Sequence, residues 1–94
     1  MFRGKKYLTR GVDGEIPLEL QLLMWEYIRR MPVDRDYLQV FILSQKGNSQ
    51  EIIHKQAEPE YGRKYTIKSI SPLNEKIYVI DDGEYATMLL ASEY

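Results

Sequence analysis

His54 is the only histidine in the 94-residue chain, and it is the first residue to consider for chemistry. A lone histidine acts as a general base when a carboxylate orients it and a nucleophile lies within reach. The sequence places neither partner beside it, and the run Ile52–Lys55 is typical of a strand, in which a histidine needs only one hydrogen bond. A small enzyme with a site around His54 and Asp81–Glu84 is therefore the least favoured of three hypotheses.

Three carboxylates lie within four residues in the sequence Asp81-Asp82-Gly83-Glu84. Hard cations bind oxygen ligands, but this segment is too short to wrap around a cation and lacks the spacing of a calcium-binding loop. The chain has no cysteine, and its six glycines do not have the spacing of a phosphate-binding loop. We predict no catalytic residues, no metal site and no cofactor.

A surface on the main helix is the best lead to function. The helix is predicted over Ile16–Met31, because Pro17 suits its first turn and Pro32 ends it. At about 100° per residue, one apolar face is assigned to the sheet; it consists of Leu20, Met24, Tyr27, Ile28 and Met31.

A second apolar group on the same helix, Leu18, Leu22 and Trp25, is flanked by Gln21 and Arg29. Two interpretations stay open. A curved sheet or the N-terminal strand buries Trp25, or the group is an exposed anchor for a protein partner, since tryptophan is common among interface hot spots. The second interpretation predicts an interaction surface and allows a homodimer.

Nucleic-acid binding is the third hypothesis. The N-terminal segment carries basic residues around a tyrosine, and strand tyrosines could stack on bases; the residues are Arg3, Lys5, Lys6, Tyr7 and Arg10. A net charge of −1 disfavours it, because phosphate contacts call for a basic excess. Clustering of Lys64 and Lys68 with the N-terminal bases on one face would favour it.

Periodicity predicts an α+β fold, in which one main helix packs on a mostly antiparallel sheet of five or six strands. The strands are expected at 6–11, 36–45, 51–56, 64–70, 76–81 and 84–90. The centre of 36–45 is nearly all apolar, which predicts a strand covered on both faces. In 64–70, Tyr65 and Ile67 are expected to face inward. The segment 84–90 could also form a short helix, but the preceding Asp82-Gly83 turn favours a strand.

Composition indicates one soluble domain over residues 1–94, with 44% hydrophobic and 29% charged residues. No apolar run is long enough for a membrane helix, and no signal peptide is evident, so we expect a cytoplasmic protein. Residues 1–10 carry a charge of +4 and residues 74–94 a charge of −4. This pattern fits chain ends that lie side by side in the fold, or a dimer that pairs them.

Several specific strings resemble a bacterial family, domain of unknown function 960. They span nearly the whole chain in order: 7–12, 16–21 with Trp25, 36–41, 53–56, 59–61, 80–91 and the final Glu93-Tyr94. The resemblance implies a small protein of Gram-positive bacteria, often phage-related or associated with other mobile elements, and it supplies no activity or functional residues. We therefore expect a non-catalytic protein–protein interaction or regulatory module.

Overall fold

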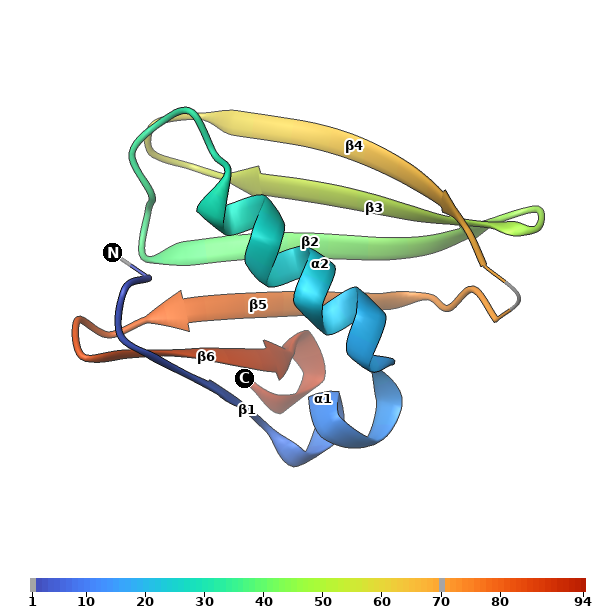
Figure 1. The fold of residues 1–94 in the computed structure, drawn as a ribbon, viewed down its shortest axis with the longest axis horizontal. Coiled ribbons are helices and arrows are strands. Elements are labelled where there is room, and N and C mark those ends of the chain that lie inside the picture. Colours follow the sequence, from blue (N-terminus) through green and yellow to red (C-terminus); the bar gives the residue numbers. More distant parts are fainter. Residues whose placement is uncertain (1, 70) are drawn as a thin grey trace.

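A six-stranded sheet with one long helix across one of its faces forms the fold (Figure 1). The computed structural model describes residues 2–69 and 71–94. The elements in chain order are β1 (Lys5–Leu8), α1 (Arg10–Glu15), α2 (Leu18–Arg29), β2 (Leu38–Lys46), β3 (Ser49–Gln56), β4 (Tyr61–Lys68), β5 (Glu75–Asp81), β6 (Tyr85–Leu90) and the 3₁₀ turn η1 (Ala91–Glu93).

The strand order is β1-β6-β5-β2-β3-β4. Strand β1 pairs in parallel with β6, and the other neighbours are antiparallel. The predicted α+β class, with one main helix on a mostly antiparallel sheet, is confirmed. The strand prediction for 84–90 is also confirmed, because the Asp82-Gly83 turn, with Gly83 at φ 103°, folds β6 back onto β5.

The prediction missed α1, which follows β1 directly. Thr9 caps it, accepting a hydrogen bond from the Val12 N–H, and the side chain of Val12 is fully buried. With only six residues and two glycines, this helix has no periodic pattern long enough to recognise. The predicted first strand accordingly ends earlier, at Leu8, and the main helix begins later, at Leu18, after the bend at Ile16.

The core lies between α2 and the covered face of the sheet. Helix α2 contributes Leu20, Met24 and Ile28, as its periodicity predicted, while Tyr27 is half-buried and stacks on Tyr65 of β4 with 3.8 Å between ring centroids. The sheet contributes Phe41, Leu43, Ile52, Ile77, Val79, Met88 and Leu90. The inward orientation of Tyr65 and Ile67 is confirmed, and Ile70, predicted as the end of that strand, lies outside the described residues.

The prediction that β2 is covered on both faces is wrong. The apolar run in β2 indicated cover on both faces, yet the α-helices pack on one face only (Figure 1). Successive residues of a strand point to opposite faces, so every second residue of β2, beginning with Leu38, lies on the uncovered face. The residues Leu38, Val40, Ile42 and Ser44 are half-buried rather than buried, and Lys46 is exposed.

The two chain ends lie side by side, as the charge pattern predicted. Lys5 pairs with Tyr85 across the parallel β1–β6 ladder. The Phe2 N–H donates to Asp81, and the Thr9 hydroxyl donates to Glu93 at 2.6 Å. Among the described residues, no helix has both the length and the apolar character needed to cross a bilayer.

Two glycines in α1 provide a test of how this helix is held. A Cβ on Gly11 would lie 2.7 Å from both the Glu93 carboxyl carbon and a Leu90 methyl, whereas a Cβ on Gly14 would meet nothing within 4 Å. We expect Gly11→Ala to destabilise the fold by about 1–3 kcal/mol through overpacking. Gly14→Ala should stabilise it by about 0.5 kcal/mol, because alanine favours helices. Urea unfolding of both variants checks this, and equal effects would contradict the close contact between α1 and η1.

Candidate functional site

His54 lies inside the protein, without solvent exposure, on the helix-covered face of β3. Its Nε2 is 2.7 Å from Gln39 Oε1, and its ring stacks on Phe41 at 4.3 Å between centroids. The Gln39 amide nitrogen donates to Gln56 Oε1 at 2.6 Å and to the Asp36 carbonyl at 3.0 Å. These contacts make His54 the end of a buried chain of polar side chains.

The tautomer of His54 follows from this chain. The Gln39 oxygen can only accept, so Nε2 carries the proton, and Nδ1 is left as a buried acceptor without a partner. Burial lowers the pKa of His54 to about 4, because the apolar surroundings disfavour the charged imidazolium. His54 is therefore a neutral packing residue near pH 7.

The carboxylates at Asp81–Glu84 do not reach His54. Asp81 accepts hydrogen bonds from the Phe2 and Gly83 N–H groups. Asp82 accepts from the Glu84 and Tyr85 N–H groups at 3.1 Å, and these bonds lower the pKa of Asp82. Both acids hold the β5–β6 turn and the N-terminal segment. The structure does not bring together the groups that the enzymatic hypothesis needs.

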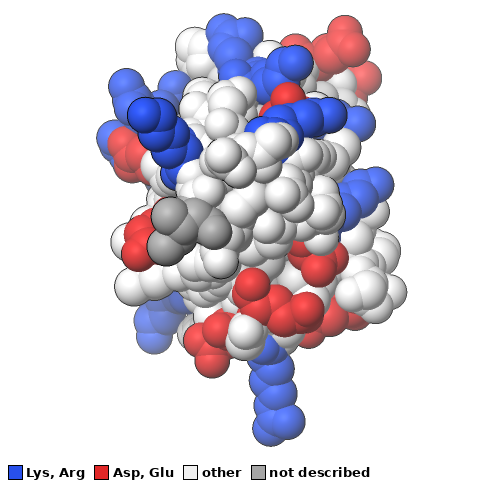
Figure 2. All heavy atoms as spheres, turned by 90° about the vertical axis from the view of Figure 1, so that its right-hand side faces the viewer, with Lys and Arg blue, Asp and Glu red and all other residues white. Residues whose placement is uncertain are grey.

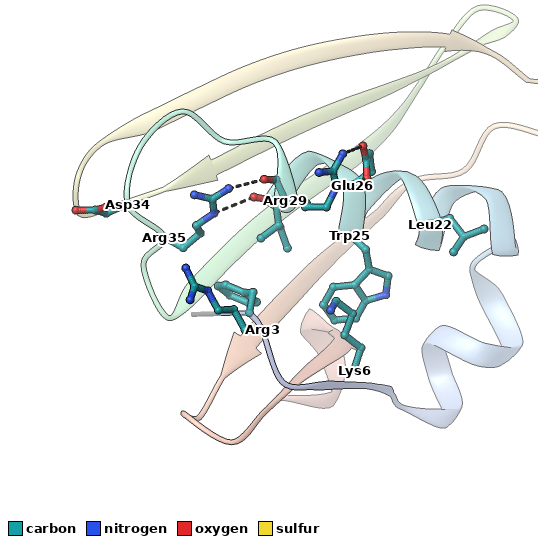
Figure 3. Close-up of a pocket in the computed structure, with 10 residues that line it drawn as sticks. Arg3, Lys6, Leu22, Trp25, Glu26, Arg29, Asp34 and Arg35 are labelled. Atoms are coloured by element: carbon teal, nitrogen blue, oxygen red, sulfur yellow. Dashed lines mark hydrogen bonds and ion pairs between the residues drawn. The ribbon is translucent and has the colours of Figure 1, made fainter.

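A groove of about 690 Å³ lies between α2 and the N-terminal segment, and we call it the arm groove (Figure 3). The apolar part of its lining is Phe2, Leu22, Trp25 and Ile28, and the charged part is Arg3, Lys6, Glu26, Arg29, Asp34 and Arg35. Figure 3 shows Trp25 and Lys6 side by side between the helix and the N-terminal segment. The apolar side chains and the cationic side chains therefore face the same hollow.

The predicted interaction surface borders this groove. Leu18 is 64% exposed and Leu22 is 59% exposed, one helical turn apart. Trp25 is half-buried, with the Lys6 ammonium 5.8 Å from its ring centroid, so the N-terminal strand shields it in part. Arg29 is exposed and binds Glu26, with Nε 2.8 Å from Oε1. Trp25 is therefore neither fully buried nor fully exposed.

Gln21 does not lie at the edge of the surface, and this prediction is wrong. Its side chain is buried, and its amide nitrogen donates to the Ile16 carbonyl at 2.8 Å. That bond ties the bend between α1 and α2 to the long helix. Because α1 was not predicted, no pattern indicated that position 21 faces another element rather than solvent.

Arg35 is a groove residue that sequence reasoning missed. Its guanidinium donates to the carbonyls of Ile28, Arg29 and Val33, so it caps the C-terminal end of α2 (Figure 3). Four carbonyls at the end of a helix lack partners within the helix, and a basic residue a few positions beyond that end is the signal that could have found this cap.

The basic residues of the nucleic-acid hypothesis do not form one patch. Arg3 and Lys6 line the arm groove, and Arg10 begins α1. Lys5 and Tyr7 alternate with Lys6 and so point to the uncovered face, where Tyr7 contacts Tyr85 edge-on at 5.2 Å. The β4 lysines Lys64 and Lys68 lie at the opposite edge of the sheet. Lys5 shares the uncovered face with Lys64 and Lys68 but lies on the opposite edge strand, and the other N-terminal bases lie elsewhere, so these residues do not gather in one cluster.

A family model described as a Staphylococcal protein of unknown function (DUF960) matches residues 5–93. The chain belongs to the DUF960 family. This confirms the resemblance seen in the sequence. No curated protein matches the DUF960 chain significantly.

A crystal structure of a protein of unknown function from Enterococcus faecalis is similar to the DUF960 chain with a TM-score of 0.78. The two are 20% identical, and the match covers 97% of this chain and 91% of that one. At this identity the likeness shows the fold alone.

His54 makes the stability of the fold depend on pH. In the unfolded chain histidine has a pKa near 6.5, whereas the folded pKa is about 4. Below pH 6.5 the unfolded chain therefore binds a proton that the folded chain does not, and stability falls as the pH falls. We expect a loss of about 2 kcal/mol between pH 7 and pH 5.

The measurement is urea unfolding across that range, with His54→Phe as the matched variant. Phenylalanine keeps a ring against Phe41 but cannot titrate. It leaves the Gln39 oxygen without its partner, so the variant should be less stable at pH 7 by about 1–3 kcal/mol. Between pH 7 and pH 5 its stability should change much less than that of the wild type. Parallel pH profiles would show that His54 is not the titrating group.

Proposed function

We propose that the DUF960 chain is a non-catalytic protein-binding module that uses the arm groove. The observation that carries this is the exposure of Leu18 and Leu22 beside a groove that contains Trp25. Large apolar side chains grouped at a hollow are typical of interaction sites, and tryptophan dominates the energetics of many interfaces.

The charges of the groove indicate the chemistry of its ligand. The two ion pairs among the described residues are Arg29–Glu26 and Lys64–Glu51. Within that part of the chain, Arg3 and Lys6 thus have no acidic partner, while Arg35 is engaged by backbone carbonyls. The complementary ligand is a protein segment that places an apolar side chain against Leu22 and Trp25 and a carboxylate near Arg3 and Lys6.

A volume of about 690 Å³ suits such a segment, since it holds one or two large side chains rather than a whole domain face. The hypothesis of a binding or regulatory module is consistent with the absence of a His54–carboxylate pair. The expectations of a cytoplasmic location and of mobile-element origin stay predictions, and binding in the groove does not depend on either.

Trp25 is the only tryptophan, so its fluorescence reports on the arm groove alone. The probe is a set of short synthetic peptides that combine one or two leucines with aspartate and glutamate, and a matched set with lysine in place of the acids. We expect the acidic set to change the emission of Trp25 in a saturable way. The lysine set should leave the emission unchanged.

Two variants locate the binding. Lys6→Glu reverses one groove charge, and Leu22→Ser removes an exposed apolar contact, so each should weaken binding about tenfold, the equivalent of roughly 1.4 kcal/mol. The control is Lys55→Glu, the same charge change on β3, which should bind as the wild type does. An emission of Trp25 that no acidic peptide alters would contradict the proposal. A wild-type dimer that Leu22→Ser converts to a monomer, seen by light scattering, would identify a second copy as the occupant and contradict a foreign ligand.

A further inference from the structure

The uncovered face of the sheet has an apolar centre, although such faces normally carry polar residues. On β2, Leu38, Val40 and Ile42 point to this face, which we call the open face. The register adds apolar neighbours on both sides of β2, namely Ile53 on β3, Tyr78 and Ile80 on β5, and Leu89 on β6. A continuous apolar area therefore crosses the four central strands.

Little of the described chain covers this area. Both α-helices contribute to the core on the opposite face. The C-terminal residue Tyr94 contacts Tyr78 edge-on at 5.6 Å, which places the end of the chain at one side of the open face. The residues at its centre on β2 remain half-buried. The apolar pattern of β2 predicted cover on both faces of the sheet. Within residues 2–69 and 71–94, only one face is covered by helices.

Lysines surround the apolar centre. The alternation of each strand assigns six lysines to the open face: Lys5, Lys46, Lys55, Lys64, Lys68 and Lys76. The same alternation assigns it one acid, Glu51, whose carboxylate is 3.8 Å from the Lys64 ammonium. Among the strand residues, the open face thus carries six lysines and one acid, although the chain as a whole has a net charge of −1.

Figure 2 looks at the right-hand side of Figure 1. Basic side chains gather at its upper end and a group of acids lies below the middle, although each region also holds side chains of the other sign.

A hollow of about 370 Å³ opens on this face where β2 begins and β3 ends. Its lining combines the apolar side chains of Leu38, Val40 and Ala57 with Tyr37 and the polar or charged residues Asp36, Lys55 and Gln56. Tyr37 is 53% exposed, so its ring is available to a partner. The hollow can hold one large apolar side chain with an acidic group beside it.

We propose that the open face docks an acidic amphipathic segment of a protein partner, at a second site distinct from the arm groove. Leucine-like side chains would cover Val40 and Ile42, one of them would enter the hollow, and carboxylates would meet the surrounding lysines. Apolar contact supplies affinity, and the lysines supply orientation and rate of association.

The open face fits other occupants less well. A second copy joined by its own open face would bring lysines towards lysines, and like charges across an interface oppose association. Nucleic acid is stacked by aromatic ring faces. The centre of this face is mostly aliphatic, and its strand tyrosines contact other tyrosines edge-on, Tyr78 with Tyr94 and Tyr7 with Tyr85. A protein segment satisfies both the apolar centre and the basic border.

The test uses a labelled peptide of about 18 residues, with leucine along one side of a helix and glutamate elsewhere. Fluorescence anisotropy measures its binding to the full chain. Lys55→Glu should weaken binding about tenfold, and so should the pair Val40→Thr with Ile42→Thr, which keeps β-branched side chains on the strand. Because the arm groove is also proposed to take acidic peptides, every protein in this comparison carries Lys6→Glu, which reverses a charge of that groove. The matched control adds Arg10→Glu, a charge change at an exposed position on α1, which should leave binding unchanged. Raising the salt from about 50 to 200 mM should weaken binding to the wild type.

Circular dichroism establishes whether each variant folds. If the threonine pair does not fold, Lys55→Glu, a change at an exposed position, still decides the test. Equal binding by all variants, or none by the wild type, would overturn the proposal. So would a wild-type dimer that the threonine pair makes monomeric, or a single-stranded oligonucleotide that binds more tightly than the peptide and is lost in Lys55→Glu. Anisotropy in the Lys6→Glu background reports on the open face, and Trp25 emission in the wild type reports on the arm groove, so failure here and failure of the groove are distinguishable.

Discussion

One helix of 12 residues has to cover one face of a six-stranded sheet. Helix α2 is about 18 Å long, whereas the outer strands of such a sheet lie about 24 Å apart. The helix therefore cannot cover the face alone, and irregular segments complete the cover. A buried segment brings backbone groups that need hydrogen bonds. Buried glutamines supply them: Gln56 donates to the carbonyls of Asp34 and Pro59, Gln50 holds Leu73, and Gln21 holds Ile16.

The need to give buried polar groups hydrogen-bond partners also explains the single histidine. Gln39 uses its amide nitrogen on Gln56 and on the Asp36 carbonyl, which leaves its oxygen to be satisfied inside the protein. His54 donates to that oxygen, and its ring fills the space beside Phe41. A residue that looks catalytic in the sequence thus completes the polar chain that holds the segment between α2 and β2. The consequence is a stability that depends on the pKa of one buried imidazole.

Strong periodicity made the main elements predictable. Short elements, and features that depend on residues far apart in the sequence, could not be predicted. Alternation located β2 to β6, and the stripe of Leu20, Met24 and Ile28 located α2. The six-residue α1 is too short for a pattern, and its partner Glu93 is 82 positions from Gly11. The surface of Leu18, Leu22 and Trp25 was visible because it repeats along one helix. The role of Gln21 depended on α1, and the bare face of β2 depended on the absence of a second layer, which no local pattern encodes.

The distribution of charge matters more for association than the net charge of −1. The sheet separates the six lysines of the open face from the arm groove, where Arg3 and Lys6 lie beside Trp25. Both surfaces combine apolar side chains with an excess of basic ones, and the arm groove also carries Glu26 and Asp34, so neither surface is a close complement of itself or of the other. Self-association would require one of them to meet the acidic side of another copy. Such a head-to-tail contact has no closed symmetry of its own and tends towards open chains. Acidic foreign segments, the occupants proposed for both surfaces, would satisfy them without that consequence.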